Sequence, residues 1–178
     1  MIKDDLKKIL VSEEQIANRC KELGRQLDHD YADKHNVLFV GILKGSVPFM
    51  AELIKRVSID IEIDFMAVSS YSGTESLGDI KIIKDLEQSI QGRDLILVED
   101  IVDTGVTIDS LKTLLYNKGA NDVKVVTLLD KPSRRQVDIK ADYIGFEVEN
   151  EFVVGFGLDY NQRYRNLPYV GVLKEELY

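Results

Sequence analysis

The sequence predicts an α/β fold in which helices cover both faces of a mostly parallel sheet. Three apolar runs have the length of buried strands: Val37–Ile42, Leu95–Val98 and Val123–Leu129. Segments with helical character separate them, which is the pattern of strand–helix–strand units. No repeat, low-complexity tract or Pro/Ser-rich linker interrupts the chain, so we expect residues 1–178 to form a single domain.

The first long element is an amphipathic helix that begins at Ser12. Gln15 follows three residues later, which gives the capping-box pattern of a helix start. Apolar residues then recur at helical spacing up to Tyr31, and charged residues occupy the other face. This pattern indicates a helix that packs against the sheet and serves a structural purpose.

The next elements alternate between helix and strand. A helix is expected from Ser46 to Lys55, because proline is well tolerated in a first turn and Pro48 lies there. Residues 59–68 favour a strand, and a third helix is expected from about Thr107 to Asn117, ended by a glycine. Further strands are expected at residues 143–148 and 151–156.

The segment from Ser70 to Asp79 contains two glycines and shows no apolar period, so we expect a loop. Long loops in compact domains often act as lids over binding sites, and plain disorder is the alternative.

Charge and composition restrict the class of protein. The 31 acidic and 23 basic residues give a net charge of −8, which is unfavourable for binding a nucleic-acid backbone. Cys20 is the only cysteine, so an internal disulfide and a cysteine-cluster zinc site are both excluded. The longest apolar run is far shorter than the roughly 20 residues of a membrane span. No signal-peptide pattern follows the N-terminus, and we expect no membrane partner and a cytoplasmic location.

The most informative segment follows the second apolar run. Glu99 and Asp100 come directly after that run, and the residues from Asp103 to Thr107 form a turn at the start of a helix. Ligands of open α/β sheets bind beyond the carboxyl ends of the strands. Backbone N–H groups at a helix start bind phosphate, whereas carboxylates repel it. The combination suits a phosphorylated sugar: the N–H groups would bind its phosphate, and the carboxylates would accept hydrogen bonds from its hydroxyls.

Simpler readings of this segment are that Asp103 and Thr104 merely cap the helix and that the two acids form a solvated strand end. The nucleotide-binding motifs do not fit. The chain lacks the P-loop pattern G-x-x-x-x-G-K-[ST], and Gly155 and Gly157 lack a third glycine at Tyr160 that would give G-x-G-x-x-G.

The segment from Leu95 to Thr107 resembles the phosphoribosyl pyrophosphate (PRPP) motif of type I phosphoribosyltransferases. Four other segments narrow the resemblance to the hypoxanthine or hypoxanthine-guanine phosphoribosyltransferases. They are Leu43–Ser46, Ser70–Tyr71 with Gly78–Ile80, Leu129–Pro132, and Phe152–Asn161 with Arg165. All five occur in the family's order between about residues 37 and 170.

The resemblance implies roles for the PRPP motif. Glu99 and Asp100 would hold the ribose hydroxyls. The turn formed by Asp103, Thr104, Gly105, Val106 and Thr107 would hold the 5′-phosphate. Some family members carry a lysine in place of Val106, but the backbone N–H remains available with any side chain. Asp103 would also be the general base at purine N7.

The resemblance also implies how the base is recognised. Lys131 would donate a hydrogen bond to purine O6, and a lysine suits a 6-oxo group but not the 6-amino group of adenine. Phe152 would stack on the base, and the backbone of Val153 would bind its Watson–Crick edge. Taken locally, Lys131 also fits a surface lysine and Phe152 an ordinary core aromatic.

The remaining implied roles concern pyrophosphate, metal and lid. Lys44, Gly45 and Arg165 would bind the pyrophosphate group, next to a cis peptide bond between Leu43 and Lys44. Mg²⁺ would be the cofactor, with Asp159, Glu99 and Asp100 as its carboxylates. Ser70 and Tyr71 would close over the reaction centre.

The fold implied is the type I phosphoribosyltransferase fold, with a small hood formed by the N- and C-terminal segments. The activity implied is purine salvage, in which PRPP and a 6-oxopurine give a nucleotide and pyrophosphate, by a homodimer or homotetramer. Two alternatives stay open: a PRPP-sensing regulator without activity, and an enzyme that prefers xanthine. Lys131 does not distinguish among oxopurines, because all of them present O6.

Overall fold

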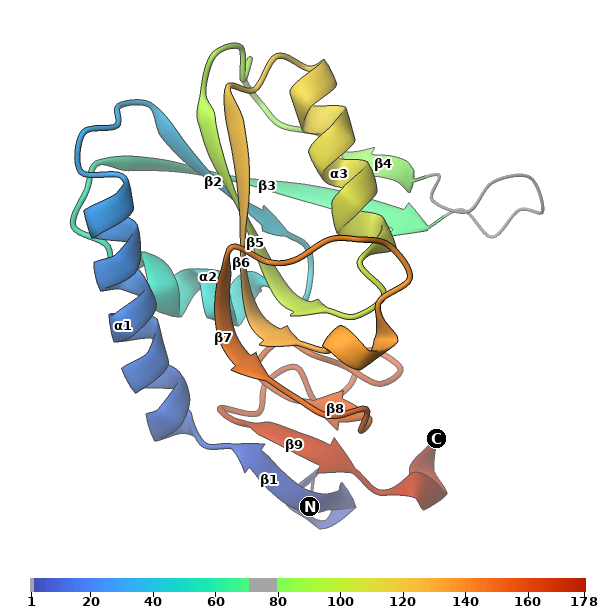
Figure 1. The fold of residues 1–178 in the computed structure, drawn as a ribbon. Helices are drawn as coiled ribbons and strands as arrows, with labels where there is room; N and C mark the ends of the chain where they lie inside the picture. The colour runs from blue at the N-terminus through green and yellow to red at the C-terminus, as the bar shows by residue number, and fades with distance from the viewer. Residues whose placement is uncertain (1, 71–79) are drawn as a thin grey trace.

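A six-stranded sheet forms the centre of the computed structural model, which describes residues 2–70 and 80–178 (Figure 1). The strand order is β4-β3-β2-β5-β6-β7. The strands are β2 (Val37–Ile42), β3 (Ile61–Ser70), β4 (Ile80–Lys84), β5 (Asp94–Val102), β6 (Asp122–Asp130) and β7 (Tyr143–Glu147). All neighbours pair in parallel except β4, which lies antiparallel on β3 at the edge. The predicted mostly parallel sheet is confirmed.

Helices cover both faces of this sheet (Figure 1). The helices are α1 (Glu13–Asp30), α2 (Val47–Ile54) and α3 (Val106–Asn117). Alternate residues of β5 serve the two faces, because successive strand side chains point to opposite sides. Ile96 and Val98 are fully buried with α1 and α2, and Leu95 and Leu97 are fully buried with α3. Burying each such side chain stabilises the fold by about 1.5–3 kcal/mol.

The predicted helix starts have the expected local contacts. At α1, the backbone N–H of Gln15 donates to Ser12 Oγ (3.2 Å) and the N–H of Ser12 donates to Gln15 Oε1 (2.8 Å), which completes the capping box. Pro48 lies in the first turn of α2. Gly119 follows α3 with φ +94°, a conformation that side chains rarely adopt.

A second, antiparallel sheet joins the two ends of the chain. Its strands are β1 (Leu6–Val11), β9 (Val170–Leu173) and β8 (Val153–Val154), in the order β1-β9-β8. It lies beyond the β7 edge of the large sheet, and both chain ends are found there (Figure 1). The predicted hood of N- and C-terminal segments is therefore confirmed.

Three short 3₁₀ helices complete the described structure: η1 (Ile2–Asp5), η2 (Pro132–Arg134) and η3 (Glu175–Leu177). None of the helices in the described part of the chain has the length and apolarity that a membrane span requires.

Several boundaries differ from the sequence prediction. The acidic pair lies within β5 and not beyond it, because Glu99, Ile101 and Val102 still pair with β6. The strand expected at residues 151–156 is reduced to β8, because Gly155 (φ +100°) and Phe156 (φ +47°) turn the chain away. The strands β1, β4 and β9 were not predicted.

Candidate active site

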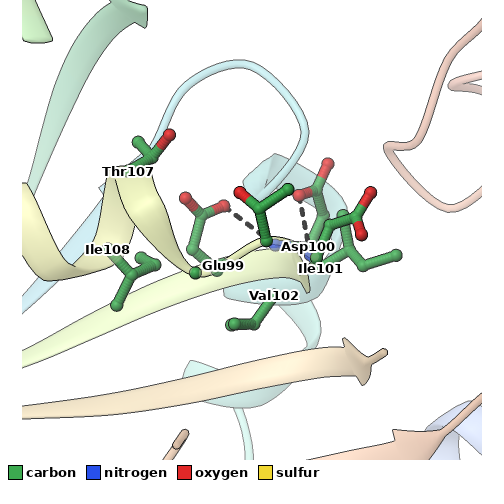
Figure 2. Close-up of a pocket in the computed structure, with 9 residues that line it drawn as sticks. Glu99, Asp100, Ile101, Val102, Thr107 and Ile108 are labelled. Atoms are coloured by element: carbon green, nitrogen blue, oxygen red, sulfur yellow. Dashed lines mark hydrogen bonds between the residues drawn. The ribbon is translucent and has the colours of Figure 1, made fainter. Parts of the chain in front are cut away.

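A cavity of about 150 Å³ lies at the carboxyl end of β5. It is lined by residues 99–105, 107 and 108, from the end of β5, the following turn and the first turn of α3. Figure 2 shows Thr107 on the side of Glu99, and Asp100 on the other side, and all three residues line this cavity. The segment singled out in the sequence therefore forms one concave site.

The two acids are held by backbone contacts and by burial. The N–H of Asp100 donates to Glu99 Oε2 (3.2 Å), and the N–H of Ile101 donates to Asp100 Oδ1 (2.7 Å) (Figure 2). Burial raises the pKa of Glu99 well above its ordinary value, and the neighbouring Asp100 raises it further. Burial also raises the pKa of Asp100, although the Ile101 hydrogen bond and the charge of Arg165 oppose that shift. Such a pair favours a hydrogen-bonding or cationic ligand.

The turn after β5 presents backbone N–H groups that could bind an anion. Gly105 has φ +83° and starts α3 without a side-chain cap, so N–H groups at the helix start lack helical partners. The hydroxyl of Thr104 accepts a long hydrogen bond from the N–H of Val106 (3.4 Å). A Cβ on Gly105 would lie 2.5 Å from Ile139 Cγ2, so the turn is packed closely against residues 135–139.

A second cavity of about 420 Å³ adjoins the first. Ile101 and Asp103 line both cavities, and Lys131, Phe152 and Val153 line only the second. The residues expected to bind the sugar phosphate and those expected to bind the base thus surround two adjoining spaces. Asp103 lies at their junction.

Lys131 is almost fully buried at the end of β6. It is 6% exposed, and its Nζ donates to the backbone oxygen of Glu151 (2.7 Å). Burial lowers the pKa of Lys131, and the nearby Asp103 carboxylate partly offsets this effect. The alternative of an ordinary surface lysine is therefore wrong.

Asp103 has a neighbour that the sequence did not reveal. Nε of Arg134, in η2, lies 2.7 Å from Asp103 Oδ1, although the contact lacks the geometry of a hydrogen bond. Arg134 also lines the second cavity. Asp103 is therefore an ion-paired carboxylate and not a simple helix cap.

A third group of polar residues comes from the loops after β2 and β8. Arg165 pairs with Asp159 Oδ1 (2.9 Å) and donates to the backbone oxygen of Gly157 (2.7 Å). Gln162 Oε1 accepts from Lys44 Nζ (3.2 Å) and from Arg165 (3.3 Å). Gln162 is missing from the predicted site, although it lies between two of the residues quoted for the resemblance.

The loop after β2 is packed tightly beside the acidic pair. The peptide bond between Leu43 and Lys44 is cis, as the resemblance implies. A Cβ on Gly45 would lie 1.6 Å from Asp100 Oδ2, and a Cβ on Gly157 would lie 1.9 Å from the backbone oxygen of Gly45. Close backbone approach therefore joins three of the five segments.

A profile of the phosphoribosyl transferase domain matches residues 8–161. A hypoxanthine-guanine phosphoribosyltransferase from Streptococcus agalactiae serotype V is 59% identical over 179 aligned residues, covering 100% of this chain and 99% of its own length. The chain belongs to the hypoxanthine-guanine phosphoribosyltransferase family. The predicted family and enzyme class, a transferase, are confirmed.

Solved structures of this family are closely similar to the structure of this chain. A hypoxanthine phosphoribosyltransferase from Staphylococcus aureus superposes with a TM-score of 0.95 at 53% identity, covering 99% of this chain and 96% of that one. A point mutant of the Trypanosoma cruzi hypoxanthine phosphoribosyltransferase, in a ternary substrates complex, superposes with a TM-score of 0.95 at 35% identity, covering 98% of this chain and 99% of that one. The predicted type I phosphoribosyltransferase fold is confirmed.

Among residues 2–70 and 80–178, no group of three or more His, Cys, Asp or Glu side chains is placed to hold a metal. The expected lid falls mainly on Tyr71–Asp79, outside the described residues, and Ser70 ends β3 with its backbone opposite Ile80.

Proposed function

We propose that this protein transfers the 5-phosphoribosyl group of PRPP to N9 of hypoxanthine and guanine, giving the nucleotide and pyrophosphate. The observation that carries the proposal is the pair of adjoining cavities with Asp103 at their junction. One cavity has the chemistry for a sugar phosphate and the other for an oxopurine. Their junction is where the bond between ribose and base would form.

The first cavity would hold the ribose 5-phosphate. The open N–H groups at the start of α3, with the hydroxyls of Thr104 and Thr107, suit the 5′-phosphate. Glu99 and Asp100 would accept hydrogen bonds from the ribose hydroxyls, since carboxylates are acceptors. As positive charge develops on the anomeric carbon, these two carboxylates would stabilise it.

The second cavity would hold the base. Lys131 would exchange or share its Glu151 partner to donate to O6, which excludes the 6-amino group of adenine. Phe152 would supply the stacking surface, and the backbone of Val153 would bind the Watson–Crick edge. Asp103 would take the proton from N7 as N9 attacks the anomeric carbon and the bond to pyrophosphate breaks.

Lys44, Gly45 and Arg165 would receive the pyrophosphate. Both cations contact the neutral oxygen of Gln162, and Arg165 also pairs with Asp159, whereas the contact of Lys44 with Gln162 leaves its charge available to the pyrophosphate. Mg²⁺ prefers one or two carboxylates together with water and substrate oxygens, so the adjacent pair Glu99 and Asp100 in the first cavity suits it. We assign Glu99 and Asp100 to it, and Asp159 as a separate carboxylate on the pyrophosphate side, because no three such side chains of the described residues are grouped to hold one ion. Bound Mg²⁺ would neutralise charge on the pyrophosphate leaving group.

We further propose that Ser70 and Tyr71 close over the site, that residues 1–178 act as one catalytic unit, and that it assembles as a homodimer or homotetramer. The buried free thiol of Cys20 is compatible with the reducing cytoplasm, which we propose as its location.

The proposal is tested by offering purified protein PRPP and Mg²⁺ with hypoxanthine, guanine, xanthine or adenine in separate reactions. We expect nucleotide from hypoxanthine and guanine, none from adenine, and none when EDTA removes the metal. Turnover of xanthine alone would overturn the substrate. Tight PRPP binding without turnover of any base would favour the regulator.

A further inference from the structure

Tyr178 lies against the base cavity, although neither the sequence motifs nor the proposed reaction uses it. Its ring stacks on Phe152 with centroids 4.6 Å apart and planes 25° apart. Tyr178 also lines the same cavity as Asp103 and Lys131. The purine base is also expected to stack on Phe152. Tyr178 therefore either competes with the base for this ring or supports the ring from its other face.

The cavity remains open with Tyr178 in this position. Its volume of about 420 Å³ lies within the roughly 300–1,000 Å³ range of small-molecule sites. A purine therefore has room without displacing the tyrosine. This observation favours a supporting role over a plug.

The three rings are arranged so that Tyr160 and Tyr178 do not cover opposite faces of Phe152. Tyr160 meets Phe152 at 5.6 Å and 88°, and the centroids of Tyr160 and Tyr178 are 6.5 Å apart. If Tyr160 and Tyr178 covered opposite faces of Phe152, their separation would approach the sum of the other two distances. The shorter value places Tyr160 toward the edge of Phe152. Of these two tyrosines, only Tyr178 occupies a face of that ring.

Backbone hydrogen bonds connect the segment before Tyr178 to Phe152 and to the N-terminal residues. The N–H of Leu173 donates to the backbone oxygen of Phe152 (2.9 Å), and the N–H of Lys174 donates to that of Asp5 (3.1 Å). The N–H of Leu177 then donates to the oxygen of Lys174 (3.1 Å), which forms η3. These bonds bring η3, and Tyr178 after it, to the second cavity.

We propose that Tyr178 is a positioning residue for base recognition: it stacks on one face of Phe152 and fixes that ring so that its other face receives the purine. This inference rests on the proposed function, because it assigns a role within the same base cavity. It predicts an effect on the purine and none on PRPP, since Tyr178 lines the second cavity only.

The test compares Tyr178→Ala and Tyr178→Phe with Leu177→Ala as the matched control. Leu177 is the neighbouring exposed residue and does not line the cavity. We expect Tyr178→Ala to raise KM for hypoxanthine roughly two- to tenfold, the range of an aromatic pair, with KM for PRPP unchanged. Tyr178→Phe keeps the stacked ring and should retain the wild-type KM, as should Leu177→Ala.

Calorimetric titration with inosine monophosphate gives a readout that does not depend on turnover. The dissociation constant of inosine monophosphate from the Tyr178→Ala variant should rise by the same factor as KM for hypoxanthine. An unchanged circular dichroism spectrum would show that the variant keeps its fold. An unchanged or lower KM for hypoxanthine would overturn the proposal, and a lower value would identify Tyr178 as a plug. An equal rise in KM for PRPP would also overturn it. Failure of the wild-type protein to turn over any base would instead overturn the proposed function.

Discussion

The Cα of Gly45 faces the Asp100 carboxylate at a distance that leaves no room for a side chain. A Cβ on residue 45 would lie 1.6 Å from Asp100 Oδ2 and 2.5 Å from its Cγ. The acidic end of β5 and the loop after β2 are therefore fitted to one another. Since Gly45 is assigned to the pyrophosphate and Asp100 to the ribose, this contact would set the spacing of the two halves of PRPP.

Gly45→Ala should therefore damage PRPP binding. The added methyl must push the carboxylate or the loop aside, and misplacement by about 1 Å can cost on the order of 100-fold in rate. We expect kcat/KM for PRPP to fall at least about tenfold in steady-state assays. Gly92→Ala is the control, because nothing lies within 4 Å of its added Cβ; the positive φ of Gly92 (+72°), which Gly45 lacks, confines its cost to local backbone strain. Equal activity of the two variants would contradict the account.

Gln162→Ala should weaken the same half of the site more mildly. Gln162 Oε1 lies between Lys44 Nζ and Arg165, so its loss frees two long side chains that would bind pyrophosphate. A side-chain hydrogen bond to a charged group contributes about 1.5–3 kcal/mol, so we expect KM for PRPP to rise roughly tenfold. KM for hypoxanthine should not change. A larger effect on hypoxanthine than on PRPP would show that Gln162 serves the base instead.

Asp64 should make stability depend on pH below neutrality. Burial alone would raise the pKa of Asp64, but hydrogen bonds from the N–H of Glu87 (2.8 Å), the N–H of Phe65 (2.7 Å) and Lys84 Nζ (3.2 Å) outweigh it and lower the pKa. The folded state therefore favours the carboxylate. Its stabilisation is present above the unfolded pKa of about 3.9 and is lost as pH falls through the folded pKa.

Asp64→Asn should accordingly reduce the free energy of unfolding by about 1–3 kcal/mol at pH 7. The difference from wild type should shrink as the pH falls below about 4 in urea titrations. Asp60→Asn, at an exposed position nearby, provides the control. If the difference in free energy of unfolding between wild type and Asp64→Asn stayed constant down to strongly acidic pH, the charge of the Asp64 carboxylate would not be its cause.

Cys20 should be chemically inert in the folded protein. It is fully buried in α1, and burial raises its pKa to about 12. Because the thiolate is the reactive form, an aromatic disulfide reagent at pH 8 should label the native protein only as it unfolds. Labelling in denaturant should be complete within minutes. Prompt labelling of the native protein would show that α1 opens readily.

Much of the fold was predictable because its strong signals are local. The apolar runs of β2, β5 and β6 have core faces on both sides, and Ser12 and Gln15 set the start of α1 through neighbouring atoms. The weaker strands depend on distant partners. In β1, the segment Leu6–Val11 contains two lysines and only one buried residue, so its strand character appears only when β9 lies beside it.

The site shows the same division. Glu99, Asp100 and Asp103 lie within five residues of one another, so their convergence follows from one strand end. The sequence prediction missed three residues that loops and a 3₁₀ helix bring to the site, because no local pattern marks them: Arg134, Gln162 and Tyr178. Nothing in the local pattern around Tyr178 indicates that it reaches Phe152, 26 positions away in the sequence.

We propose above all that Asp103, at the junction of the two cavities, carries out the proton transfer of the phosphoribosyl reaction. The most direct measurement is the single-turnover rate of inosine monophosphate formation by Asp103→Asn, with Asp109→Asn on the exposed face of α3 as control. General-base catalysis contributes about 10²–10⁴-fold, so the rate should fall by at least roughly 100-fold while PRPP still binds. A rate within about threefold of wild type would contradict the account, because a general base contributes far more than that.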